Sequence, residues 1–230
     1  MRIGGLQKLT LLDYPGKVAC TVFLIGCNLR CPYCHNPGLV LPERMDGQEI
    51  PTDEIFGFLE QRRGKLDGVC ITGGEPTLWQ ELPEFISDIR SLGYAVKLDT
   101  NGTNPDMLKE LLSDGLLDYV AMDIKNGPSR YAITCGGEDV IDSVRESAAL
   151  LFNGTAEYEF RTTVCKPLHT EKEMGEIGRM LRGAKRYFIQ PFADSGDLVV
   201  GDVQAHTREE LVRLRQAVLP YIPNTELRGI

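Results

Sequence analysis

Short apolar runs recur along this chain, and a stretch with helical spacing of apolar residues follows most of them. The run over residues 18–25 is almost continuously apolar and β-rich, which is typical of a strand buried on both faces. The later runs are shorter and are bounded by Gly, Pro, Asn or Asp. The pattern predicts six strands, over residues 18–25, 68–72, 94–99, 119–123, 157–164 and 186–190.

Amphipathic helices are predicted between these strands. Apolar residues recur at helical spacing over 52–63, 82–92 and 140–152. Asn104 is a candidate N-cap, with Pro105 in the first helical position. Capping boxes predict two more helix starts, at Thr170 with Glu173 and at Thr207 with Glu210.

The alternation of strand and helix sets the fold class. Six β–α units in sequence predict an α/β fold with an all-parallel sheet and right-handed crossovers. Eight units would close a barrel, so six predict a partial (β/α)6 TIM-like barrel. We interpret residues 1–17 as a lead-in ending in a turn at 13–16. No linker rich in Pro, Gly or Ser divides the chain, which indicates one domain over residues 1–230.

Composition narrows the class of protein. The net charge of −8 argues against a nucleic-acid partner, because phosphate binding depends on excess Lys and Arg. No apolar run approaches the roughly 20 residues of a membrane span, and the first residues do not resemble a signal peptide. Seven unevenly spaced cysteines suit a reducing compartment. We therefore expect a cytoplasmic protein with a small-molecule or protein partner and no membrane partner.

The loop over residues 26–38 follows the first predicted strand and carries Cys27, Cys31 and Cys34. Three thiolates this close favour an iron–sulfur cluster, zinc or copper(I). Structural zinc sites and fully ligated cubane clusters take four protein ligands. Three cysteines therefore leave one position open for an exogenous ligand, which indicates a reactive centre.

Three other interpretations fit part of this loop. Cys31 and Cys34 alone form a C-x-x-C motif of the thioredoxin type, which leaves Cys27 without a role. Cys31 to His35 matches the C-x-x-C-H haem-attachment pattern, which usually accompanies export. Zinc could use His35 as a fourth ligand, although adjacent residues seldom point at one ion.

The string GCNLRCPYCHNP resembles the cluster loop of radical S-adenosylmethionine (SAM) enzymes, and among these the activating enzymes of glycyl radical enzymes. The resemblance implies that Cys27, Cys31 and Cys34 are the catalytic metal ligands, holding three irons of a [4Fe-4S] cluster whose fourth iron binds SAM. It implies an oxidoreductase with flavodoxin or ferredoxin as electron donor. It also implies that SAM cleavage leads to a radical on a glycine of a partner enzyme.

Polar residues gather at the ends of the later strands. Because carboxyl ends of parallel strands meet at one edge of a sheet, we expect these residues to share one site. They are Gly73, Gly74, Glu75, Asp99, Thr100, Asn101, Asp123, Lys125 and Arg161.

The resemblance gives these residues roles at SAM. Gly73-Gly74-Glu75 would offer backbone groups to the amino end of SAM, since glycine permits a close approach. Asp99, Thr100 and Asp123 would form a monovalent cation site, while Lys125 and its polar neighbours, Asn101 among them, would hold the methionyl group. Arg161 would clamp the SAM carboxylate, because an inward-facing arginine needs an anion. The alternatives are ordinary turns at Gly73-Gly74 and Asn101-Gly102, and an exposed ion pair of Asp123 with Lys125.

The partner is indicated by residues 12–18, LDYPGKV, which most resemble the longer form of anaerobic ribonucleoside-triphosphate reductase activating proteins. Pyruvate formate-lyase activases usually have Gly at the position of Tyr14. Those activases also have a histidine that contacts SAM after the sixth strand, and Gln190 stands in that region here. The spacing of Cys20, Cys70, Cys135, Cys165, His169 and His206 indicates no role.

Three alternatives remain open at this point. The chain could activate another glycyl radical enzyme, such as pyruvate formate-lyase. It could act on a small molecule, as 7-carboxy-7-deazaguanine synthases do. In a different class, it could be a redox or electron-transfer protein that uses Cys31 and Cys34 without SAM.

Overall fold

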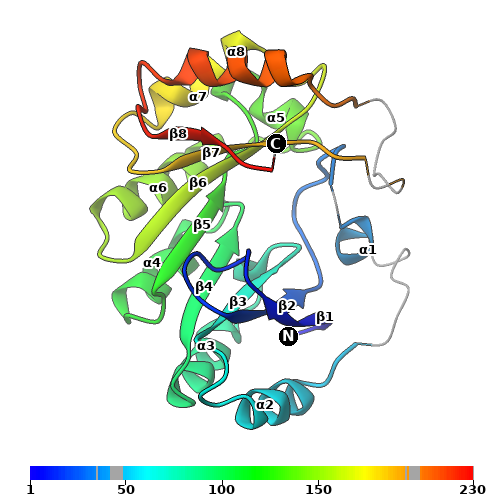
Figure 1. The fold of residues 1–230 in the computed structure, drawn as a ribbon, viewed down its shortest axis with the longest axis vertical. Coiled ribbons are helices and arrows are strands. Elements are labelled where there is room, and N and C mark those ends of the chain that lie inside the picture. Colours follow the sequence, from blue (N-terminus) through cyan, green and yellow to red (C-terminus); the bar gives the residue numbers. More distant parts are fainter. Residues whose placement is uncertain (35, 42–48, 195, 197–202, 230) are drawn as a thin grey trace.

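The computed structural model describes residues 1–34, 36–41, 49–194, 196 and 203–229. One curved sheet has its eight strands in sequence order (Figure 1). The strands are β1 (Ile3–Thr10), β2 (Ala19–Leu24), β3 (Gly68–Gly73), β4 (Ala95–Thr100), β5 (Tyr119–Asp123), β6 (Glu157–Val164), β7 (Tyr187–Pro191) and β8 (Thr225–Leu227). Neighbouring strands from β2 to β8 are parallel, and β1 is antiparallel to β2.

The predicted α/β class and all six predicted strands are confirmed, with boundaries that shift by about one residue. The prediction of an all-parallel sheet is wrong, because residues 1–17, predicted to be a lead-in, contain the antiparallel strand β1. The link from Thr10 to Ala19 is too short for a crossover of a dozen or more residues, so the chain reverses instead. Gly16, at a φ of 73°, provides the left-handed residue in that turn. β8 is a further strand, at the other edge of the sheet, that the sequence pattern did not indicate.

Helices line the outer, convex side of the sheet (Figure 1). The main ones are α2 (Thr52–Gln61), α3 (Leu82–Ser91), α4 (Pro105–Ser113), α6 (Ile141–Asn153), α7 (Glu171–Met180) and α8 (Arg208–Val218). Short helices lie in loops: α1 (Pro37–Val40), η2 (Pro76–Leu78), η3 (Pro128–Arg130) and α5 (Tyr131–Thr134). The Asn104 cap and both predicted capping boxes are confirmed.

The two faces of the sheet differ in character. Outward-facing strand residues such as Ile71, Leu98 and Phe160 are fully buried in the main hydrophobic core with the helices. The alternate residues point to the inner face, and many of them are polar, for example Asp99 and Arg161. The helices therefore cover the apolar face, and the polar face is left to form a site.

No helix in the described part of the chain combines the length and the apolarity needed to cross a membrane. The expected cytoplasmic location and the single domain over residues 1–230 stay predictions.

The capping box of α8 gives a test of local stability. Thr207 Oγ1 accepts a hydrogen bond from the Glu210 amide at 3.3 Å, and the Thr207 amide donates to the Glu210 carboxylate at 2.7 Å. Thr207→Ala should lower the free energy of unfolding by about 1 kcal/mol, because the amide of Glu210 loses its acceptor. Urea unfolding measures the change. Thr207→Ser keeps the acceptor, and an equal loss in that variant would contradict the capping role.

Candidate functional site

A cavity of about 450 Å³ opens at the carboxyl ends of the parallel strands. Of the twelve residues predicted for the site, all except Glu75 line it. They are Cys27, Cys31, Cys34, Gly73, Gly74, Asp99, Thr100, Asn101, Asp123, Lys125 and Arg161. Residues that sequence reasoning did not select, including Asp13, Tyr33, Thr72 and Thr163, line it too, and so does Gln190.

The three cysteines reach this cavity from the loop after β2. The Cys34 amide donates to the Cys31 carbonyl at 3.1 Å, and the Leu29 amide donates to Cys27 Sγ at 3.4 Å. Among the described residues, no three His, Cys, Asp or Glu side chains are gathered closely enough to hold a metal ion. The loop thus brings the thiols to one cavity without converging them on one point. His35, part of the resemblance and of the zinc interpretation, lies outside the described residues.

Cys31 differs from the other two cysteines in its surroundings. A hydrogen bond with Cys135 and the nearby Lys125 ammonium lower the pKa of Cys31 to about 7, against the effect of burial. Burial raises the pKa of Cys27 to about 11. Cys135 also accepts a hydrogen bond from the Arg30 amide through its carbonyl, at 2.9 Å. Cys135 therefore supports the cysteine loop, although its position in the sequence gave no sign of this.

The glycine pair after β3 meets the chain's own backbone. Gly73 has a φ of +125°, and a Cβ on it would lie 2.2 Å from the Leu24 carbonyl oxygen. A Cβ on Gly74 would lie 2.0 Å from the Gly26 carbonyl oxygen. The Gly74 amide donates to the Leu24 carbonyl at 2.9 Å, and the Glu75 amide donates to the Gly26 carbonyl at 2.7 Å. The β3 loop is thus bound directly to the end of β2 and to the start of the cysteine loop. This close backbone contact is sufficient to explain why both positions are glycine. The backbone contact with SAM stays a prediction.

Glu75 has a structural role that its motif did not indicate. Its carboxylate is fully buried and accepts hydrogen bonds from the amide and hydroxyl of Thr77, the hydroxyl of Thr100 and the amide of Asn101, at 2.6–3.1 Å. Burial raises the pKa of this carboxyl, and the four donors oppose that shift. Glu75 thus joins the loops after β3 and β4 instead of lining the cavity.

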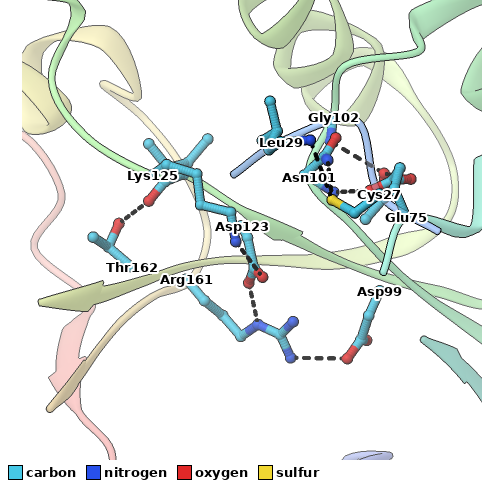
Figure 2. A network of polar contacts seen from close by, with 12 residues as sticks. Cys27, Leu29, Glu75, Asp99, Asn101, Gly102, Asp123, Lys125, Arg161 and Thr162 are labelled. Carbon is cyan, nitrogen blue, oxygen red and sulfur yellow. Dashed lines mark hydrogen bonds and ion pairs between the residues drawn. The ribbon is translucent and has the colours of Figure 1, made fainter. Parts of the chain in front are cut away.

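Asn101 continues this connection to the cysteine loop (Figure 2). Its side-chain amide donates to the Asn28 side chain at 3.1 Å and to Cys27 Sγ at 3.9 Å. Its side-chain oxygen accepts from the hydroxyl of Thr103 at 2.6 Å. The Asn101-Gly102 turn therefore also connects the loop after β4 to the cysteine loop.

Five charged groups form an alternating chain across β4, β5 and β6. Arg161 lies between two carboxylates, with 3.2 Å from Nη1 to Asp99 Oδ2 and 2.9 Å from Nε to Asp123 Oδ1 (Figure 2). Lys125 Nζ extends the chain at 3.1 Å from Asp123 Oδ2. Lys97 pairs with Asp99 at the other end. These partners outweigh burial, so the pKa values of Asp99 and Asp123 are lowered and those of Lys125 and Arg161 are raised.

This chain changes two arguments made from the sequence. The anions that Arg161 requires are Asp99 and Asp123, so an inward-facing arginine does not by itself demand the SAM carboxylate. The carboxylates of the expected cation site are already paired with Lys97, Arg161 and Lys125. The structure gives no support for an added monovalent cation.

His169 is a further residue that sequence spacing did not select. Its Nδ1 accepts from the Cys165 amide at 3.1 Å, which leaves Nε2 to donate to the Lys125 carbonyl at 2.8 Å. The hydroxyl of Tyr33 donates to the same carbonyl at 3.3 Å. The backbone of Lys125 is thereby held by residues 44 and 92 positions away in the sequence.

Comparison with known proteins shows the family to which this chain belongs. The sequence profile of the radical SAM superfamily matches residues 21–181, a span that contains all twelve predicted site residues. The chain belongs to the radical SAM superfamily. This superfamily uses a [4Fe-4S] cluster and SAM, which leaves the dithiol-exchange, zinc and haem interpretations of the loop without support.

Individual relatives refine this result. A candidate glycyl-radical enzyme activating enzyme of Methanocaldococcus jannaschii is 32% identical over 237 residues, covering 99% of this chain and 96% of its own. A pyruvate formate-lyase-activating enzyme of Clostridium pasteurianum is 35% identical over 54% of this chain and 52% of its own. A 7-carboxy-7-deazaguanine synthase of Methanopyrus kandleri is 34% identical over 50% of this chain and 54% of its own.

A solved structure supports the fold. Streptococcus suis SuiB bound to S-adenosylmethionine matches with a TM-score of 0.70 at 17% identity, covering 90% of this chain and 49% of that chain. The radical SAM enzyme described here thus shares its fold with a protein that is about twice as long.

The close backbone contact at Gly74 gives one test of the site. Gly74→Ala should lower the melting temperature and reduce iron incorporation on reconstitution, because the new Cβ would overlap the Gly26 carbonyl. Gly57→Ala is the matched control, since its Cβ would meet nothing within 4 Å. That control should be neutral or stabilising, and wild-type iron content in Gly74→Ala would contradict the contact.

The lowered pKa of Asp123 predicts an acid-dependent stability. Its folded pKa lies below the ordinary value of 3.8, so its contribution is present above that value and is lost as the pH falls through the folded pKa. Asp123→Asn should therefore be less stable than the wild type at pH 7 and should lose less stability on acidification towards pH 3. Urea unfolding across this range measures both. The exposed Asp142→Asn serves as the control and should follow the wild-type profile.

Proposed function

We propose that this radical SAM enzyme is an activating enzyme that generates a glycyl radical on a partner protein. The observation that carries the proposal is the similarity to an activating enzyme over nearly the whole of both chains, at 32% identity. A pyruvate formate-lyase-activating enzyme, which is also an activase, matches 54% of the chain, and a 7-carboxy-7-deazaguanine synthase, which has another reaction, matches 50%. These partial matches select no single substrate.

The side chains of the cavity fit the cofactors of the superfamily. Cys27, Cys31 and Cys34 offer an all-sulfur donor set that suits an iron–sulfur cluster, with one iron left for an exogenous ligand. Thiolates are the ligands, and the nearby Lys125 and Cys135 favour the thiolate form of Cys31. When bound, the reduced cluster and SAM supply one-electron cleavage that ends in hydrogen-atom abstraction from glycine.

The other cavity residues would bind and orient SAM. Lys125 lies at the end of the ion-pair chain nearest the cysteines, where its ammonium can pair with a carboxylate. Gly74 contributes its backbone to the cavity lining, and Asn101 and Gln190 contribute amide side chains. Arg161 sets the position of Asp99 and Asp123 through its two ion pairs.

For the partner, we propose anaerobic ribonucleoside-triphosphate reductase, with flavodoxin or ferredoxin as electron donor. The resemblance of residues 12–18 supports this choice of partner, and pyruvate formate-lyase is the alternative. The expected cytoplasmic location is consistent with seven cysteines that are all free in the structure.

The decisive experiment measures SAM cleavage and radical transfer separately. The chain would be reconstituted anaerobically with iron and sulfide, reduced with dithionite and given SAM, and 5′-deoxyadenosine would be quantified. The wild type should produce it, and Cys34→Ala should not. A wild-type protein that holds its cluster and makes no 5′-deoxyadenosine would contradict radical SAM chemistry in this chain.

Radical transfer is tested by adding the candidate partner. Electron paramagnetic resonance should show a glycyl radical on the anaerobic reductase, and Gly→Ala at its radical site should abolish the signal. A signal with pyruvate formate-lyase alone would reassign the partner. Cleavage of SAM with no radical on either protein would favour a small-molecule substrate.

A further inference from the structure

The innermost charge of the ion-pair chain has no role in the activity described so far. We propose that Lys97 is a positioning residue of the SAM site, a tethered cation that holds Asp99 and, through Arg161, the residues that face SAM. This inference rests on the proposed function for its link to SAM. Its structural part, that an ammonium ion is required at this place, can be tested without SAM.

The surroundings of Lys97 carry the argument. It lies on β4, two residues before Asp99 on the same inner face, and is 1% exposed. Its Nζ pairs with Asp99 Oδ1 and lies 3.7 Å from Cys70 Sγ. Lys97 does not line the cavity, so it lies behind Asp99 and acts on the site through that carboxylate.

Both oxygens of Asp99 have a cationic partner. Lys97 pairs with Oδ1, and Arg161 Nη1 lies 3.2 Å from Oδ2. Loss of Lys97 would leave Oδ1 without a cation. This would destabilise the fold, because a buried carboxylate that loses a charged partner is costly. Asp99 would then draw the guanidinium of Arg161 away from Asp123, which also holds Lys125.

The charge count shows how this matters for a ligand. The ion-pair chain has three positive charges, from Lys97, Arg161 and Lys125, and two negative charges, from Asp99 and Asp123. These five groups together carry one net positive charge. One carboxylate, such as that of SAM, balances it. Without Lys97 the ion-pair chain is neutral, and its electrostatic attraction for a carboxylate is weaker.

The test replaces the tether with a free ion. In Lys97→Ala, the vacated space beside Asp99 Oδ1, which would keep only the Cys70 thiol as a partner, should bind ammonium or potassium from solution. The melting temperature of the full chain would be measured in ammonium, potassium and tetramethylammonium chloride at one ionic strength. Lys97→Ala should melt about 10 °C below the wild type in tetramethylammonium, whose ion is too large for the space, and should recover part of this loss in ammonium.

The wild type and Lys109→Ala, which changes an exposed lysine on α4, should respond equally to the three salts. Lys97→Ala/Asp99→Asn removes both charges and should lose the salt response. An equal melting temperature of Lys97→Ala in all three salts, or failure to fold in any of them, would overturn the proposal.

SAM binding gives the second readout. The dissociation constant for SAM, measured by equilibrium dialysis on the reconstituted protein, should rise about tenfold in Lys97→Ala and return towards the wild-type value in ammonium. Lys97→Arg keeps the charge and should bind SAM more tightly than Lys97→Ala. Unchanged binding in Lys97→Ala would overturn the positioning role. If the wild type itself does not bind or cleave SAM, the proposed function fails while the salt response still tests the tethered cation.

Discussion

The pairing of buried charges on the inner face of the sheet is the constraint on which this structure depends. Inside a protein, an unpaired ammonium or carboxylate is strongly destabilising, so each one must meet an opposite charge or several hydrogen-bonding partners. The strand register meets this requirement, because Asp123 on β5 lies directly beside Arg161 on β6. A parallel sheet with helices on its outer face leaves the inner face free for such a chain of charges.

The cysteine loop is held by four separate segments of the chain. The backbone amide of Glu75 donates to the Gly26 carbonyl, and Asn101 contacts Cys27. Tyr33 donates to the carbonyl of Lys125, and Cys135 contacts Cys31. The position of the loop therefore depends on these neighbours as well as on its own hydrogen bonds, such as the one from the Cys34 amide to the Cys31 carbonyl.

Lys125 connects the two systems. Its side chain ends the ion-pair chain at Asp123, and its backbone carbonyl accepts from both Tyr33 and His169. The ion-pair chain and the cysteine loop are therefore linked through one residue, Lys125. A change in the ion-pair chain would therefore also affect the cysteine loop, and the reverse, as the proposed binding of a cluster and SAM side by side would require.

The sequence by itself determined six of the strands, the capped helices and many of the residues that line the cavity, because these depend on short-range patterns. Apolar runs, Thr-x-x-Glu boxes and the spacing of Cys27, Cys31 and Cys34 can be read without knowing the fold, and the end-of-strand rule then gathered the polar residues. Only the tertiary structure decided that the lead-in forms the antiparallel β1, that Glu75 ties two loops together, and that Lys97 and Arg161 hold Asp99. His169 and Cys135 likewise gain their roles from contacts across 44 and 104 residues, and no local pattern records which distant groups a register will bring into contact.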